Sequence, residues 1–154
     1  MKKLSLKKPG KKAVAGILLL AVLAAGCIWG CGQLRGDGSI EFTQVEKEQL
    51  PAALVEEILP QYQQLERALA CIVEEQVYVI ATRGEKTTTG YTVGIEDITL
   101  QEIDGLTRMT VHAIFGDPES GALLNQELNY PYAVALTQLK ELPDEIELKV
   151  RYED

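Results

Sequence analysis

The segment VYVIATRGEKTTTGYTV, residues 77–93, decides the fold of this chain. Its first five residues, 77–81, are apolar at every position, which is typical of a strand covered on both faces. A polar stretch with two glycines, Gly84 and Gly90, follows, and at Tyr91 an alternation of apolar and polar residues begins. The pattern predicts a central strand, a loop, and a second strand with one buried face.

The second strand contains a change of phase. Apolar residues stand at odd positions up to Ile95 and at even positions from Ile98 onward. A period of two cannot keep one face buried across such a change unless an extra residue is inserted. We therefore expect a β-bulge or bend at Glu96 and Asp97.

Further strand patterns lie on both sides of this pair. The segment 65–73 fits a helix about as well as a strand, and we favour a strand because the polar residues 74–76 make a short turn into Val77. A turn at Asp104 and Gly105 separates two more strand patterns, and the turn-rich stretch 116–121 follows. The remaining expected strands are Ile40–Val45, Leu106–Phe115, Tyr132–Leu136 and Ile146–Tyr152.

One short helix is expected between the first two strands. In LPAALVEEILP, residues 50–60, Pro51 suits the first turn of a helix and Pro60 suits its end. We expect Leu54, Ile58 and Tyr62 to pack on the sheet. Five to six strands and this helix predict a mostly-β domain, an antiparallel sandwich or an open barrel.

The N-terminal segment, residues 1–31, has the layout of an export signal. Six lysines lie in the first twelve residues, and no charge occurs from Ala13 to Trp29. LAAGC, residues 23–27, resembles a bacterial lipobox, which implies lipidation of Cys27. The alternatives are lipidation at Cys31 and an uncleaved membrane helix of about 19 residues, close to the ~20 that span a bilayer. We favour a lipoprotein, and each alternative places the rest of the chain on the extracytoplasmic face of the cell membrane.

The remaining chain divides into a Gly-rich spacer, residues 32–39, and one domain, residues 40–154, which is long enough for a single core. Beyond residue 12 the chain has nine basic and 23 acidic residues, a net charge of −14. Such a domain repels phosphates and anionic lipid headgroups, so we exclude nucleic-acid binding. Cys31 and Cys71 could pair in an oxidising compartment, but we favour a buried free Cys71.

No set of residues in the sequence supports catalysis. The one histidine, His112, is expected on the solvent face of its strand, and neither histidines nor cysteines have the spacing of a metal site. No serine lies in a nucleophile elbow, and paired acids such as Glu74 and Glu75 are typical of turns. We therefore predict a protein that is not an enzyme and needs no cofactor or metal.

The loop before Tyr91 has two interpretations. It is either a turn in which threonine hydroxyls cap the backbone, or an exposed loop that contacts another protein. On the second interpretation the partner-binding residues are Glu85, Lys86, Thr87, Thr88, Thr89, Gly90 and Tyr91.

A family resemblance favours the second interpretation. Residues 77–98, together with 40–58 and the DPESG and YPYAVAL segments between residues 117 and 136, resemble the protease complex subunit PrcB family in its C-terminal domain. The resemblance implies a membrane-tethered, extracytoplasmic domain that binds a protein partner, as an accessory or stabilising subunit of a surface protease complex, without activity of its own.

Two alternatives remain open on the sequence. The TTTGY segment, residues 87–91, is similar to the loop with which chagasin-like inhibitors enter the cleft of papain-like cysteine proteases, although Glu85 and Lys86 replace the Asn-Pro of that loop. This similarity implies a cysteine protease inhibitor. The other alternative is a structural envelope lipoprotein without a dedicated partner.

Overall fold

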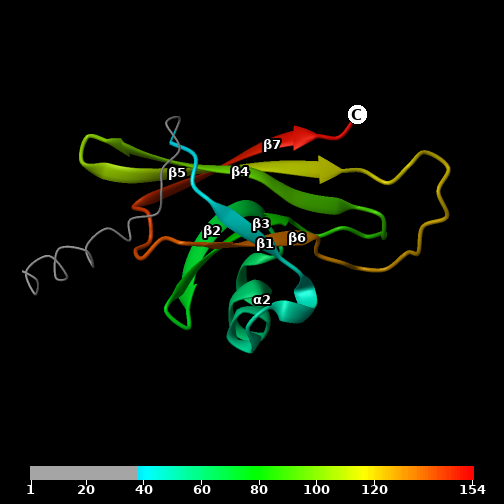
Figure 1. Cartoon of the computed structure of the whole chain (residues 1–154). Coiled ribbons are helices and arrows are strands. Elements are labelled where there is room, and N and C mark those ends of the chain that lie inside the picture. The colour runs from blue at the N-terminus through cyan, green and yellow to red at the C-terminus, as the bar shows by residue number, and fades with distance from the viewer. Residues whose placement is uncertain (1–37) are drawn as a thin grey trace, which may run out of the picture. The chain divides into compact units, whose positions relative to one another are not determined.

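The computed structural model describes residues 38–154, which form seven strands and a short helical segment (Figure 1). The mostly-β prediction is confirmed, and the strands form two open sheets rather than a closed barrel. The strands are β1 (Phe42–Val45), β2 (Glu66–Val73), β3 (Gln76–Arg83), β4 (Thr92–Ile103), β5 (Leu106–Gly116), β6 (Tyr132–Thr137) and β7 (Glu145–Tyr152). A short 3-10 turn, η1 (Lys47–Gln49), follows β1. The helical segment consists of η2 (Leu54–Ile58) and α2 (Leu59–Tyr62), which are continuous.

The two sheets and the helical segment form three layers. One sheet has the order β4-β5-β7, and the other has the order β1-β6-β3-β2. In Figure 1 the first sheet lies above the second, and α2 lies against the opposite face of the second sheet. The second sheet is therefore covered on both faces.

Strand β3 is the central strand that the apolar run predicted. Val79 and Ala81 face the core between the sheets, while Tyr78 and Ile80 face the core beneath the helical segment. All residues from Val77 to Arg83 are buried. Because β3 is covered by the first sheet on one face and by the helical segment on the other, its sequence is apolar at successive positions rather than at alternate ones.

The predicted bulge in β4 is confirmed. The register against β5 shifts between Ile95 and Asp97. Because of the extra residue, both Ile95 and Ile98 reach the core between the sheets although they are three positions apart.

The direction of β7 differs from the expectation. All other pairings are antiparallel, but β7 runs parallel to β5, with Met109 opposite Ile146 and Phe115 opposite Tyr152. After β5 the chain crosses to the other sheet, forms β6, and returns to the first sheet from the far end. Alternation of apolar residues predicts which face of a strand is buried, but it carries no information about strand direction.

The helical segment is shifted relative to the prediction. It continues through Pro60, which lies in the first turn of α2, where a missing N–H is tolerated. The preceding turn, η2, is a π-helix, so Leu54 and Leu59 share the buried face instead of Leu54 and Ile58. Ile58 is half-buried and packs against the same core, as expected, whereas Tyr62 is exposed rather than packed.

The parallel pairing of β5 and β7 begins at a capped carboxylate. Oδ2 of Asp144 accepts hydrogen bonds from the backbone N–H and the hydroxyl of Thr107, both at 2.7 Å, and these bonds lower the pKa of Asp144. A carboxylate with a lowered pKa stabilises the fold above its unfolded pKa, and this contribution is lost as the pH falls through the folded value.

We therefore expect Asp144→Asn to lower the urea midpoint of unfolding at pH 7, and the difference from the wild type to shrink below about pH 4, where aspartate is protonated in the unfolded chain. Glu147→Gln, at an exposed position of β7, is the control and should have no such effect. Urea titrations from neutral to acidic pH measure the difference. If the difference is as large in acid as at neutral pH, the carboxylate charge is not its source.

Within residues 38–154, no helix is long and apolar enough to cross a membrane. The signal segment, Cys27 and Cys31 lie outside the described residues. The domain boundary predicted at residue 40 therefore remains a prediction.

Candidate functional site: the loop end of the sandwich

The threonine loop, defined as residues 84–91, joins β3 to β4, and its two glycines are required by the backbone. Gly84 has φ +79° and Gly90 has φ +97°, a region that other residues rarely adopt. A Cβ on Gly90 would also come within 2.8 Å of Cβ of Pro118. Gly90 therefore permits both the turn and the close approach of a second loop.

That second segment is the long loop, residues 117–131, between β5 and β6. It extends beyond the sheets on the right of Figure 1. Its conformation is held by the threonine loop, because the backbones of Lys86 and Asn129 exchange two hydrogen bonds of 2.9 Å. The N–H of Thr89 donates to the carbonyl of Asn125 at 3.0 Å, and the N–H of Asn125 donates to the Thr89 hydroxyl at 3.1 Å. The two loops thus form one unit.

Side chains of the threonine loop are exposed to different degrees. Glu85 and Thr87 are exposed, as is Gly90. Their neighbours Lys86, Thr88, Thr89 and Tyr91 are half-buried. The threonine loop therefore offers a partner a narrow outer face, while its inner face is occupied by the long loop.

The long loop carries apolar side chains into solvent. Leu123 is fully exposed, and Leu128 is 55% exposed. Loops of this length without secondary structure are uncommon in compact domains and are usually functional or disordered. The long loop contains Asp117, Glu119 and Glu127 but no lysine or arginine, so an anionic membrane surface repels it. The exposed leucines are therefore better suited to a protein than to a lipid surface.

Arg83, at the end of β3, is the buried cation on which this end of the sandwich is built. It is 4% exposed, and its guanidinium donates to the carbonyls of Thr92, at 3.3 Å, and Gly116, at 2.5 Å, and to the carboxylate of Asp117. The guanidinium carbon also lies 4.8 Å from the ring centroid of Tyr91 and 5.0 Å from that of Phe115. One side chain thus fixes the end of β3, the start of β4 and the end of β5.

A groove lies beside the threonine loop. It encloses about 270 Å³ and is called the tyrosine groove below. The phenol of Tyr130 donates to Oε2 of Glu85 at 3.1 Å, and Nζ of Lys47 lies 5.0 Å from the ring centroid of Tyr132. The lining residues are Lys47, Tyr91, Thr92, Val93, Asn129, Tyr130, Pro131 and Tyr132.

Two of the groove tyrosines have raised pKa values. Burial raises the pKa of Tyr130, and its hydrogen bond to Glu85 adds to this. Burial and the negative charge of Glu48 raise the pKa of Tyr132. Both phenols therefore stay protonated at neutral pH, and the groove is lined by neutral rings.

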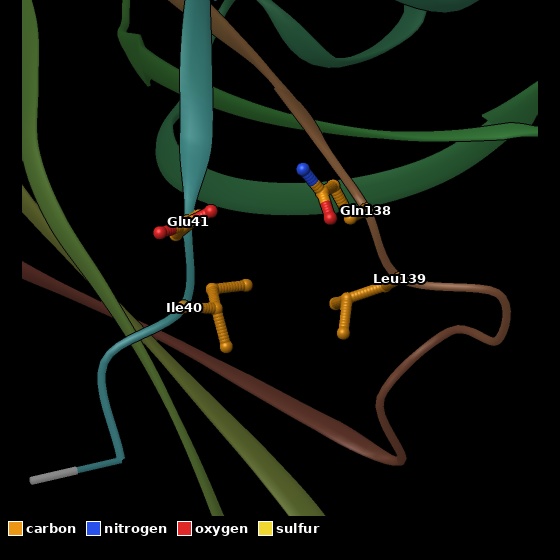
Figure 2. Close-up of a pocket in the computed structure, with 4 residues that line it drawn as sticks. All are labelled: Ile40, Glu41, Gln138 and Leu139. Carbon is orange, nitrogen blue, oxygen red and sulfur yellow. The ribbon is translucent and has the colours of Figure 1, made fainter. Parts of the chain in front are cut away.

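A second cavity, beside the residues that precede β1, is too small for a ligand. In Figure 2 the side chains of Ile40 and Leu139 point toward each other across it, with Glu41 and Gln138 beside them. Its volume of about 10 Å³ is at the lower limit for one water molecule. Ile40 and Leu139 both pack against the core between the sheets, so this cavity is a packing defect at the edge of that core.

Residues with catalytic or metal-binding chemistry are not gathered at any of these places. His112 is half-buried in β5, and Cys71 is a free, half-buried cysteine whose pKa is raised by burial. Residues 38–154 hold no group of three or more histidine, cysteine, aspartate or glutamate side chains placed to bind a metal ion.

Sequence reasoning identified the threonine loop but not the segments that complete the site. A charge at the end of a buried strand must find partners, so Arg83 could have been singled out from its position alone. Nothing in the sequence pattern brings Lys47 or Tyr130 to Tyr91, because these residues are distant along the chain.

Comparison with known protein families finds a match in this region. Residues 77–138 match the model of the family described as PrcB C-terminal. The match runs from β3 through β6 and so includes both loops and most of the tyrosine groove. No curated protein and no solved structure gives a significant match. The similarity to chagasin-like inhibitors stays a prediction.

Proposed function

We propose that the protein is a non-catalytic accessory subunit that binds a protein partner within a surface protease complex, because residues 77–138 match the PrcB C-terminal family. The binding surface is the loop end of the sandwich, formed by the threonine loop, the long loop and the tyrosine groove. The observation that carries the proposal is the fully exposed Leu123 on a long loop that is nevertheless fixed by hydrogen bonds to its neighbour. Apolar side chains held in place by a rigid framework are typical of binding surfaces.

The proposal includes a tether at the extracytoplasmic face of the cell membrane, through a lipid on Cys27. The described chain begins at Gly38, whose carbonyl accepts a hydrogen bond of 2.8 Å from the N–H of Leu100 near the β4–β5 turn. The tyrosine groove lies at the other end of β4, at Val93, about 23 Å away at roughly 3.3 Å per strand residue. The loop end therefore lies far from the point at which a tether joins the described chain, and so is free to meet another protein on the same membrane.

Site-specific photo-crosslinking tests this proposal. We expect the full-length protein to sediment with membranes and, with a photo-reactive residue at Thr87, to form one dominant covalent adduct with another protein. Thr87 is exposed at the loop end, and the same residue placed at Glu102, exposed near the β4–β5 turn, should form no such adduct. Mass spectrometry of the adduct identifies the partner.

Two results would count against the proposal. Adducts of equal yield from Thr87 and Glu102 would mean that the loop end has no special role. A protein that forms no adduct from either position, in membranes of cells that naturally produce it, would mean that no dedicated partner contacts the threonine loop.

A further inference from the structure

The outer edge of β4 is uncovered next to the tyrosine groove. Strand β4 pairs with β5 on one side, and among the described residues the other side receives the chain around Ser39, opposite Thr99, and the side chain of Gln44 at Ile95. The N–H of Ile40 donates to the carbonyl of Ile98, and the N–H of Leu100 donates to the carbonyl of Gly38. Within residues 38–154, no strand pairs with the part of this edge that precedes the bulge.

The backbone of Val93 points to this open edge. Phe115, directly opposite Val93 in the antiparallel ladder, accepts a hydrogen bond of 2.9 Å from the N–H of Glu153, so its polar groups face β7. Val93 and Phe115 therefore form a non-hydrogen-bonded pair, in which the backbone polar groups of both residues point away from each other. The N–H and the carbonyl of Val93 thus point away from β5. Two residues along, the N–H of Ile95 donates to the side chain of Gln44 at 3.4 Å, which is a long bond that another acceptor can replace.

The tyrosine groove adjoins this edge, because Thr92 and Val93 form one of its walls. Its volume of about 270 Å³ is close to the lower end of the range of roughly 300–1,000 Å³ that is usual for ligand sites. The other walls are the rings of Tyr91, Tyr130 and Tyr132 together with Pro131. Aromatic and proline walls of this size suit one or two side chains of a bound peptide.

Lys47 gives the groove its charge. It is exposed on η1, and it is the one cation among the residues that line the groove. Its contact with Tyr132 is with the ring, and no carboxylate among residues 38–154 forms an ion pair with it, although the chain is strongly acidic. Two acids act on the groove tyrosines. Glu85 accepts a hydrogen bond from Tyr130, and the charge of Glu48 acts on Tyr132. A carboxylate brought by a partner is the complement of this unpaired ammonium group.

We infer that the partner adds an extended acidic segment to the open edge of β4. The segment pairs with the backbone of Val93, places side chains in the tyrosine groove, and brings a carboxylate to Lys47. Main-chain hydrogen bonds at a sheet edge supply affinity in this mode of recognition, and the adjoining groove supplies specificity. The inference rests on the proposed partner-binding function and names the chemistry of the partner.

The test uses the full-length protein in detergent micelles and, as probe, a phage-displayed library of random 12-residue peptides. We expect the selected peptides to be rich in β-branched residues and to contain at least one acidic residue. Binding of a selected synthetic peptide should slow hydrogen exchange of the Val93 amide. Lys47→Glu should weaken this binding by about tenfold or more, since it replaces an attraction by a repulsion.

Matched variants separate the groove from general charge effects. Lys149→Glu makes the same charge change at an exposed position of β7 and should leave peptide affinity within about twofold. Val93→Pro removes the edge donor at a position where an edge strand tolerates proline, and should also weaken binding. Lys47→Glu keeps the test decisive if Val93→Pro does not fold.

Each other outcome overturns the inference. The selection can yield no binder, or it can yield peptides rich in lysine and arginine. The peptide affinity can remain unchanged in Lys47→Glu, or the protein can self-associate through β4. If Thr87 crosslinks to a partner whose binding is insensitive to Lys47→Glu and Val93→Pro, the proposed function stands and only the groove assignment fails. If peptides bind as expected but Thr87 forms no adduct, the groove stands and the membrane partner does not.

Discussion

Replacing Arg83 by alanine is expected to lower the free energy of unfolding by about 2 to 5 kcal/mol, because each buried acceptor left without its donor costs about 1 to 3 kcal/mol. The guanidinium is buried, and its loss leaves the carbonyls of Thr92 and Gly116 without their donor. It also removes the group packed between the rings of Tyr91 and Phe115. Urea unfolding of the wild type and the variant measures the difference.

Arg108→Ala is the matched control for this prediction. Arg108 forms an ion pair with Glu145 at 2.6 Å, but both side chains are nearly half exposed, so its removal should cost no more than about 1 kcal/mol. Arg83→Lys keeps the charge but loses the planar fork that reaches two carbonyls and a carboxylate at once, so we expect a result between alanine and the wild type. Equal losses for Arg83→Ala and Arg108→Ala would show that the buried network contributes nothing beyond a surface ion pair.

Leu54→Ala is expected to cost about 2 to 5 kcal/mol, because it removes a fully buried side chain from the core between the helical segment and the second sheet. Val55 is the next residue in the same helical turn and is 40% exposed, so Val55→Ala should stay within about 0.5 kcal/mol of the wild type. Thermal unfolding of both variants measures the contrast. A small loss for Leu54→Ala would mean that the helical layer adds little to the stability of the sheets beneath it.

The sequence predicts best those features that depend on local alternation of apolar residues. The run from Val77 to Ala81 predicted a strand buried on both faces, and β3 is buried against two different layers. The change of phase between Ile95 and Ile98 predicted the bulge, because a period of two leaves no other way to keep both residues inside.

Features that depend on contacts between distant parts of the chain could not be predicted from the sequence. The parallel direction of β7 and the burial of Leu59 instead of Ile58 follow from how the chain crosses between layers and from one π-helical turn. Within the candidate site, the threonine loop was visible in the sequence, but the long loop that holds it was predicted only as a turn-rich stretch. The hydrogen bonds from Asn125 and Asn129 join residues about 40 positions apart, and no local pattern reports them.

The parallel strand β7 also has a consequence for the order in which the domain can be made. Its residues Ile146, Leu148 and Val150 cover the side of the core beside β5, so the first sheet is incomplete until the ribosome has added residue 152. Pairings that join distant parts of a chain form more slowly than local ones. We therefore expect a nascent chain that ends before β7 to lack the complete first sheet, even when β4 and β5 have already been synthesised.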